Sequence, residues 1–255
     1  MEKITRKSML YPTGVEYGDY SMNHVVGCAH GCKYPCYAFL MKKRFGQVKT
    51  YEEWCKPKLV ENTLELLDKE IPRLKDKIKS VFLCFSTDPF PYIDDEDCKV
   101  RFMSFSAIAK LNSAEIKCTV LSKGTLPISL RLLSVDNEYG ISLVSLDENF
   151  RERYEPHTAP YRERIDALKC LHDAGCKTWV SMEPYPTPNI IDQDPLSILE
   201  TVSFVDKIIF GRWNYSKEAS DYPNHKDFYN FTAGYVTGFC NKFGIECVIK
   251  KGTLT

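Results

Sequence analysis

The chain has 255 residues, 44% of them hydrophobic, which is enough for one large α/β domain or two small ones with a substantial core. Basic and acidic residues number 34 each, so the zero net charge gives no support for a general nucleic-acid or membrane footprint. The N-terminus lacks the apolar run of a secretory signal, and no stretch of about 18 apolar residues could span a bilayer. We therefore expect a cytoplasmic protein without a membrane partner, whose 11 cysteines serve metal or redox chemistry rather than a disulfide framework.

Short apolar or β-branched runs alternate with longer segments of helical periodicity along the chain. The strand candidates are residues 23–26, 81–85, 118–121, 140–146, 178–182, 207–210 and 247–250. The helix candidates are residues 58–74, 98–112, 160–174 and 228–243. This alternation predicts an α/β fold with a mostly parallel sheet and helical crossovers. Because no repeat or linker interrupts the pattern, we expect a single domain over residues 1–255.

Polar residues follow five of these strand candidates, at the point where each strand ends. In a parallel sheet or barrel, sites gather beyond the carboxyl ends of the strands, so these residues should share one rim. They are residues 86–88, 122–124, 145–147, 183–184 and 211–214. The aromatic and basic segment 211–217 could either line a substrate mouth or pack against the core.

Three cysteines, Cys28, Cys32 and Cys36, lie within nine residues in a segment that also contains glycine, proline and tyrosine. Three thiolates can bind one metal centre and leave a coordination position open. The residues alone allow three interpretations: unconnected buried cysteines, a structural zinc site completed by His30 or Cys55, and an iron–sulfur cluster. A [4Fe–4S] cluster normally takes four thiolates, so another group would have to occupy its fourth iron.

The segment 28–37, CAHGCKYPCY, resembles the cluster loop of radical S-adenosylmethionine (radical SAM) enzymes. It is most similar to the branch related to spore photoproduct lyase, whose loop reads C-x-H-G-C-x-Y-C-Y. The family spacing is C-x3-C-x2-C, whereas this sequence has C-x3-C-x3-C because Pro35 is inserted before Cys36. Proline fixes φ and one residue spans at most about 3.5 Å, so we expect a local bulge that leaves the cluster in place.

Further segments follow the order of this branch over residues 20 to 190. Residues 86–89 (STDP) resemble its T-D-P turn, and residues 121–123 (LSK) resemble its L-T-K strand end. Residues 142–147, the dipeptide Glu155-Pro156 and the helix that carries Arg164 resemble its fourth strand, its E-P-R turn and its arginine-bearing helix. His157 stands where the family has the arginine of that turn.

The resemblance implies a single-domain partial (β/α)6 TIM-like barrel that binds a [4Fe–4S] cluster and S-adenosylmethionine (SAM). In that family, SAM chelates the fourth iron and is reductively cleaved to a 5′-deoxyadenosyl radical, which abstracts hydrogen from the substrate. The implied cluster ligands are Cys28, Cys32 and Cys36. The implied SAM-binding residues are Tyr37, Ser86, Lys123, Ser142, Arg164 and Glu183.

Most of these SAM-binding residues also have a structural alternative. Tyr37 could contact adenine or pack within the loop, and Ser142 could bind SAM or satisfy backbone groups of its strand. Lys123 and Arg164 suit the methionine carboxylate, because charge-assisted hydrogen bonds are favourable, but either could lie on a solvated surface. Glu183 ends a strand where the family's backbone approaches adenine, or it is a surface carboxylate.

Cys84 is the candidate for a catalytic hydrogen donor. Spore photoproduct lyase uses a cysteine for this purpose, and Cys84 precedes Ser86, near a strand end, by two residues. The alternative is a cysteine buried within a strand, which is a common position for a free thiol.

The resemblance also implies partners. An electron donor of the flavodoxin or ferredoxin type would reduce the cluster. A further likeness to the radical SAM mobile pair proteins implies a second radical SAM protein as a partner. The substrate is left open, nucleic acid included, and a DNA-lesion lyase-like repair enzyme is one alternative function. The others are a zinc-stabilised binding module and a thiol redox or cluster-carrier protein.

Overall fold

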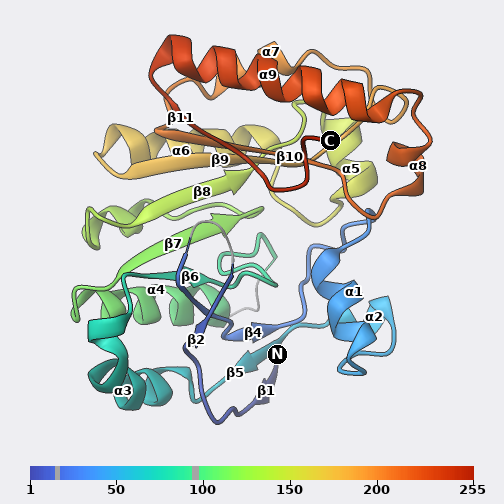
Figure 1. The fold of residues 1–255 in the computed structure, drawn as a ribbon. Coiled ribbons are helices and arrows are strands. Elements are labelled where there is room, and N and C mark those ends of the chain that lie inside the picture. Colours follow the sequence, from blue (N-terminus) through green and yellow to red (C-terminus); the bar gives the residue numbers. More distant parts are fainter. Residues whose placement is uncertain (15–17, 94–97) are drawn as a thin grey trace.

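The computed structural model describes residues 1–14, 18–93 and 98–255, and its centre is an eight-stranded sheet (Figure 1). In spatial order the strands are β11 (Glu246–Ile249), β10 (Lys207–Arg212), β9 (Lys177–Tyr185), β8 (Glu138–Ser142), β7 (Lys117–Ser122), β6 (Ser80–Leu83), β3 (Tyr20–Met22) and β2 (Tyr11–Pro12). Every neighbouring pair is parallel except β2 with β3. With β11 at one edge and β2 at the other, the sheet forms the predicted partial TIM-like barrel.

Helices connect the parallel strands and cover the outside of the sheet (Figure 1). The longer ones are α3 (Thr63–Leu74), α4 (Lys99–Asn112), α6 (Tyr161–Asp173) and α9 (His225–Phe243). The shorter ones are α1 (Tyr37–Arg44), α2 (Tyr51–Trp54), α5 (Glu148–Tyr154), α7 (Pro195–Thr201) and α8 (Lys217–Ser220), with 3-10 turns η1 (Lys75–Lys77) and η2 (Ile128–Leu132). On α6 the buried Ile165, Leu168 and Leu171 recur at the three-residue spacing that the sequence predicts for a core-facing stripe. Among the residues described, none of the helices combines the length and apolarity that crossing a membrane requires.

A smaller three-stranded sheet lies beside the main one. It consists of β1 (Glu2–Ile4), β5 (Lys58–Val60) and β4 (Val25–Val26), in this order. The predicted strand at 23–26 is therefore correct only in part, because its last two residues join this sheet and β3 is the first parallel strand of the barrel. The chain bends at His24, between β3 and β4, and the Asn23 side chain accepts hydrogen bonds from the amide and hydroxyl of Ser86. Likewise the predicted helix at 58–74 starts only at Thr63, because residues 58–60 pair with β1.

A buried ion pair fastens α6 to the carboxyl end of β8. Arg164 on α6 and Glu155 in the loop before it are both fully buried, and Nη2 of the arginine lies 2.8 Å from Oε2 of the glutamate. The same guanidinium donates to the carbonyl of Ser142 at 2.9 Å and to that of Ala159 at 2.8 Å. Because Ser142 ends β8, these bonds fix α6 and the preceding loop at the rim of the barrel.

The other oxygen of Glu155 ties two further segments to the same point. Its Oε1 accepts a hydrogen bond from the Tyr34 hydroxyl at 2.7 Å and from the Lys123 ammonium at 2.8 Å. Burial alone would raise the pKa of this carboxyl, but Lys123 and Arg164 beside it lower the pKa well below its usual range. The segment around Tyr34, the residue after β7 and α6 therefore meet at one buried negative charge.

We expect Arg164→Met to lower the free energy of unfolding by about 3–5 kcal/mol, because it leaves the buried Glu155 short of one cation. The matched control is Arg162→Met on the same helix, where the arginine side chain is 84% exposed and pairs with Asp166. That control should cost less than about 1 kcal/mol, as exposed ion pairs generally do. Urea unfolding followed by circular dichroism measures both, and equal midpoints for the two variants would show that the buried pair does not stabilise the fold.

Candidate functional site

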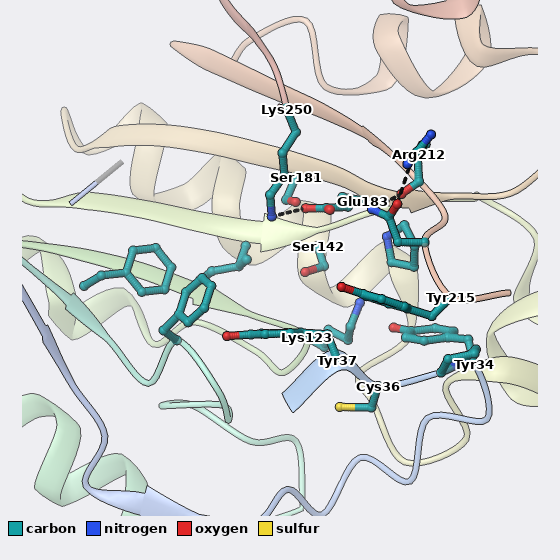
Figure 2. Close-up of a pocket in the computed structure, with 16 residues that line it drawn as sticks. Tyr34, Cys36, Tyr37, Lys123, Ser142, Ser181, Glu183, Arg212, Tyr215 and Lys250 are labelled. Carbon is teal, nitrogen blue, oxygen red and sulfur yellow. Dashed lines mark hydrogen bonds and ion pairs between the residues drawn. The ribbon is translucent and has the colours of Figure 1, made fainter. Parts of the chain in front are cut away.

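The carboxyl ends of the parallel strands open onto two adjoining cavities. The large cavity has a volume of about 380 Å³, and its wall includes Cys36, Tyr37, Lys123, Ser142, Ser181 and Glu183 (Figure 2). The second, which we call the cysteine cavity, measures about 180 Å³ and is lined by Cys28, Cys32 and Cys36 together with Ser86, Lys123 and Ser142. Because Cys36, Lys123 and Ser142 line both cavities, the two form one continuous site. Four of the five rim segments predicted from the sequence contribute to this site, whereas residues 145–147 line neither cavity.

The cysteine loop, residues 27–36, is held in place by its backbone. The amide of Cys28 donates to the carbonyl of Trp54 at 2.9 Å, and the amide of Lys33 donates to the carbonyl of Tyr154 at 2.8 Å. Gly31 has a φ of 60°, a left-handed conformation that glycine adopts without the steric cost of a Cβ. The loop thus has a defined path between its first and second cysteines.

The three thiols of the loop face one cavity in an environment that disfavours bare thiolates. Burial raises the pKa of Cys28, and it raises the pKa of Cys32 to about 12. Burial also raises the pKa of Cys36, although the amides of Phe39 and Ala38 at the start of α1 offset part of the rise. The three thiols are therefore protonated at neutral pH unless a bound cation supplies the compensating charge.

The donor set fits a metal cofactor held by several thiolates. Three free cysteines line the cysteine cavity, and the fully buried Nε2 atom of His30, in the same wall, has no hydrogen-bond partner among the described residues. Within residues 1–14, 18–93 and 98–255, no three histidine, cysteine or acidic side chains are gathered closely enough for a single ion. Cys55, the predicted fourth ligand of a zinc site, packs with Cys28 and Cys36 around Trp54 but does not line the cysteine cavity.

Asp88 organises the strand ends behind the cysteine cavity. Its carboxylate accepts hydrogen bonds from the Ser122 hydroxyl at 2.8 Å and from the Lys123 amide at 2.7 Å. Its Oδ2 also lies 3.6 Å from Nδ1 of His30, whose pKa burial lowers, so this histidine is neutral at physiological pH. Gly124, the residue after Lys123, has no room for a side chain, because a Cβ there would collide with the Phe90 carbonyl.

Lys123 presents a cation to both cavities. Its side chain is 16% exposed, its ammonium is bound to Glu155, and it lies 5.4 Å from the centre of the Tyr34 ring. An ammonium group has three protons, and the Glu155 bond uses one of them. The lysine is thus held firmly while it keeps donors for an anionic group in the cavity.

The structure brings most of the other predicted SAM-binding residues to the site. Ser142 lies in the wall of both cavities, and so does Tyr37, whose ring packs edge-on against Phe85 at 5.6 Å. Ser86 lines the cysteine cavity, where its hydroxyl donates to Asn23. Glu183 lines the large cavity and accepts a hydrogen bond from the Lys250 ammonium at 2.6 Å (Figure 2).

Arg164 and Cys84 line neither cavity. Arg164 is not on a solvated helix face, because it is fully buried, and it is connected to the site through Glu155 and the Ser142 carbonyl. Cys84 lines neither cavity and packs with Val25 and Leu59, its Sγ 3.4 Å from Nδ1 of His24. Its position gives no support to a hydrogen-donor role and matches the alternative of a buried strand cysteine.

Sequence reasoning missed several residues of the large cavity. Ser181 precedes Glu183 by two residues, so strand alternation could have placed both on the inner face. Lys250 directly follows β11, a position at the rim that the sequence had marked for earlier strands only. In the segment 211–217, Arg212 and Tyr215 line the cavity, whereas Trp213 is buried, so both predicted alternatives hold for different residues.

Comparisons with known proteins identify the family. The family model of the radical SAM superfamily matches residues 22–202. An uncharacterized protein of Methanocaldococcus jannaschii is 28% identical over 211 residues, which cover 82% of this chain and 75% of that protein. An uncharacterized protein of Acidianus two-tailed virus is 26% identical over 199 residues, which cover 74% of this chain and 64% of the viral protein.

Solved structures show the same fold. Spore photoproduct lyase complexed with dinucleoside spore photoproduct matches with a TM-score of 0.69 at 12% identity, covering 97% of this chain and 80% of that one. Streptococcus suis SuiB bound to S-adenosylmethionine matches with a TM-score of 0.53 at 16% identity, covering 72% of this chain and 40% of that one. At such identities the likeness concerns the fold, and the family model adds the membership. This chain belongs to the radical SAM superfamily.

Proposed function

We propose that this protein uses Cys28, Cys32 and Cys36 to hold a [4Fe–4S] cluster and binds SAM where the two cavities meet. The observation that carries the proposal is the continuous site itself, in which three thiols adjoin a cation and a buried serine at the strand ends. When bound, the two cofactors supply a one-electron cleavage of SAM that leads to hydrogen abstraction from a substrate.

The chain's own contribution begins with the thiols. Because burial raises their pKa values, each thiol must lose its proton as the metal centre binds, and assembly should therefore release protons. Cys36 is the N-cap residue of α1, so its thiolate would lie at the positive end of a helix dipole. His30 is neutral, so Lys123 is the cation beside the thiolates and His30 adds no positive charge to it.

Lys123 and Ser142 would hold the amino-acid end of SAM. The ammonium of Lys123 is the cation common to both cavities, and a carboxylate is its natural partner. The buried residue Ser142 adds a hydroxyl, and Tyr37 and Glu183 would face the adenosine portion. Arg164 is a positioning residue, because it binds Glu155, which in turn fixes the Lys123 ammonium.

Substrate identity is not part of this proposal. The likeness to spore photoproduct lyase concerns the fold, and a fold alone does not transfer a reaction. The DNA-lesion lyase-like alternative stays a prediction from the sequence, as does a second radical SAM protein as partner. The rest of the large cavity, with Arg212 and Tyr215 in its wall, is the space in which a substrate would meet the cofactor.

Anaerobic reconstitution with iron and sulfide, followed by dithionite and SAM, tests the core of the proposal. We expect a brown wild-type protein that forms 5′-deoxyadenosine, whereas Cys36→Ala should lose bound iron and this product. The matched control is Cys55→Ala, which removes a neighbouring thiol outside the cysteine cavity and should retain both. One bound zinc that is lost from both variants, with no 5′-deoxyadenosine from the wild type, would instead establish a structural zinc site.

A second variant tests the residues that would hold the amino-acid end of SAM. Lys123→Met should weaken SAM binding to the reconstituted protein by about 10- to 100-fold, because one charge-assisted hydrogen bond is worth about 1.5–3 kcal/mol. The control Lys117→Met changes a lysine at the opposite end of β7, which pairs with Glu138, and should leave SAM affinity unchanged. Equilibrium binding of labelled SAM, with iron content measured in parallel, gives the answer. Equal affinities for Lys123→Met and wild type would remove Lys123 from the SAM site.

A further inference from the structure

The charge of this protein is distributed unevenly. Although the whole chain has no net charge, residues 33–58 contain seven basic and only two acidic residues. This segment follows Cys32 directly and includes Cys36, α1 and α2. A strong local excess of positive charge therefore surrounds the cysteine loop.

Six of the seven basic residues form what we call the basic surface: Lys33, Lys42, Lys43, Arg44, Lys49 and Lys56. Across the described part of the chain, none of these six has an ion-pair partner, whereas the seventh, Lys58, pairs with Glu2 at 3.0 Å. The two acidic residues of the segment, Glu52 and Glu53, offset only two of these six charges, so a net charge of +4 remains. Like charges held together with so few counter-charges are costly to the isolated protein and favour an anionic partner.

The basic surface lies on the outer side of the cysteines. Helix α1 starts immediately after Cys36 and ends in Arg44, about 12 Å further along the helix axis at 1.5 Å per residue. One packed cluster joins α1 and α2 to the cysteine loop, since Cys28, Cys36, Phe39 and Tyr51 all pack around the buried Trp54. In Figure 1, α1 and α2 project together from the flank of the barrel, away from α3.

Apolar side chains are exposed among these charges. Phe45 is 69% exposed and Leu40 is 39% exposed, both within or next to α1. A charged rim around a few exposed apolar residues is the usual anatomy of a transient protein–protein contact.

We propose that the basic surface docks an acidic one-electron carrier protein that reduces the cluster, an inference that rests on the proposed function. One electron passes from the reduced carrier to the oxidised cluster, so the carrier is oxidised by one electron and no bond is formed or broken. Electron transfer weakens steeply with distance, and this face places a carrier beside the cysteines. A nucleic acid is the less suitable occupant, because the site for a substrate opens at the start of α1, where Tyr37 lines the large cavity, and Lys42, Lys43 and Arg44 lie in the last turn of this helix.

The test is a charge reversal of three exposed cations, Lys43→Glu, Arg44→Glu and Lys49→Glu, in one variant. The matched control reverses one arginine and two lysines around the end of α3 and η1: Arg73→Glu, Lys75→Glu and Lys77→Glu. Both variants change the net charge equally, and neither touches the cavities. The probes are an acidic flavodoxin and an acidic ferredoxin, each reduced beforehand and mixed with reconstituted protein by stopped flow.

We expect the second-order rate constant for cluster reduction, measured with the faster of the two carriers, to fall at least about tenfold in the α1 variant and less than twofold in the control. The reason is that electrostatic steering raises association rates by factors of about 10 or more. The difference should disappear near 1 M NaCl, where the Debye length is about 3 Å. Equilibrium binding of the same carrier to the cluster-free protein should weaken in parallel. Dithionite should still reduce all three proteins to the same electron paramagnetic resonance end point.

Three other outcomes would each overturn either the docking proposal or the proposed function. Equal carrier rates and equal carrier binding for the two variants, with an intact cluster, would overturn the docking proposal alone. Tight binding of a labelled single-stranded DNA that only the α1 variant loses, with unchanged carrier rates, would assign the surface to nucleic acid. A wild-type protein that assembles no cluster, yet still binds carrier through this surface, would overturn the proposed function instead.

Discussion

The site depends on the burial of one carboxylate, that of Glu155. A fully buried negative charge is unfavourable unless cations and hydrogen-bond donors surround it, and three segments distant in sequence supply them here. Tyr34 comes from the cysteine loop, Lys123 from the end of β7 and Arg164 from α6. Because these donors converge on the same two oxygens, the positions of the loop, the strand end and the helix are coupled. A displacement of α6 would therefore change the position of the Lys123 ammonium, and with it the proposed SAM site.

This coupling also explains how much of the site the sequence could predict. The cysteine spacing and the polar residues at strand ends are local patterns, and they pointed to Cys36 and Lys123, which line both cavities, whereas Ser142 was expected only from the family resemblance. Arg164 is a different case, since on the helix pattern alone a solvated position was as plausible as a functional one. Only its pairing with Glu155, nine residues earlier, makes its burial favourable, and a one-dimensional pattern does not show this partnership.

The partly misplaced strand at 23–26 and the position of Cys84 share a physical origin. A run of apolar residues predicts extended backbone but not which sheet it joins, and after a bend at His24 the chain leaves the path of β3 and Val25 pairs with β5. Cys84 follows β6 with a φ of 52°, so its side chain leaves the alternation of the strand and packs beside His24. Backbone conformations of this kind are set by tertiary contacts, which is why proximity to Ser86 in sequence was not proximity to the cavity.

Pro35, the residue inserted relative to the family spacing, is constrained from both sides. The Lys33 amide is bound to Tyr154 and the Tyr34 hydroxyl to Glu155, while Cys36 already serves as the N-cap of α1. The chain can therefore absorb an extra residue only between Tyr34 and Cys36. At this point Pro35 lines the large cavity and not the cysteine cavity. The insertion leaves all three thiols facing one cavity and alters instead the wall against which a substrate would lie.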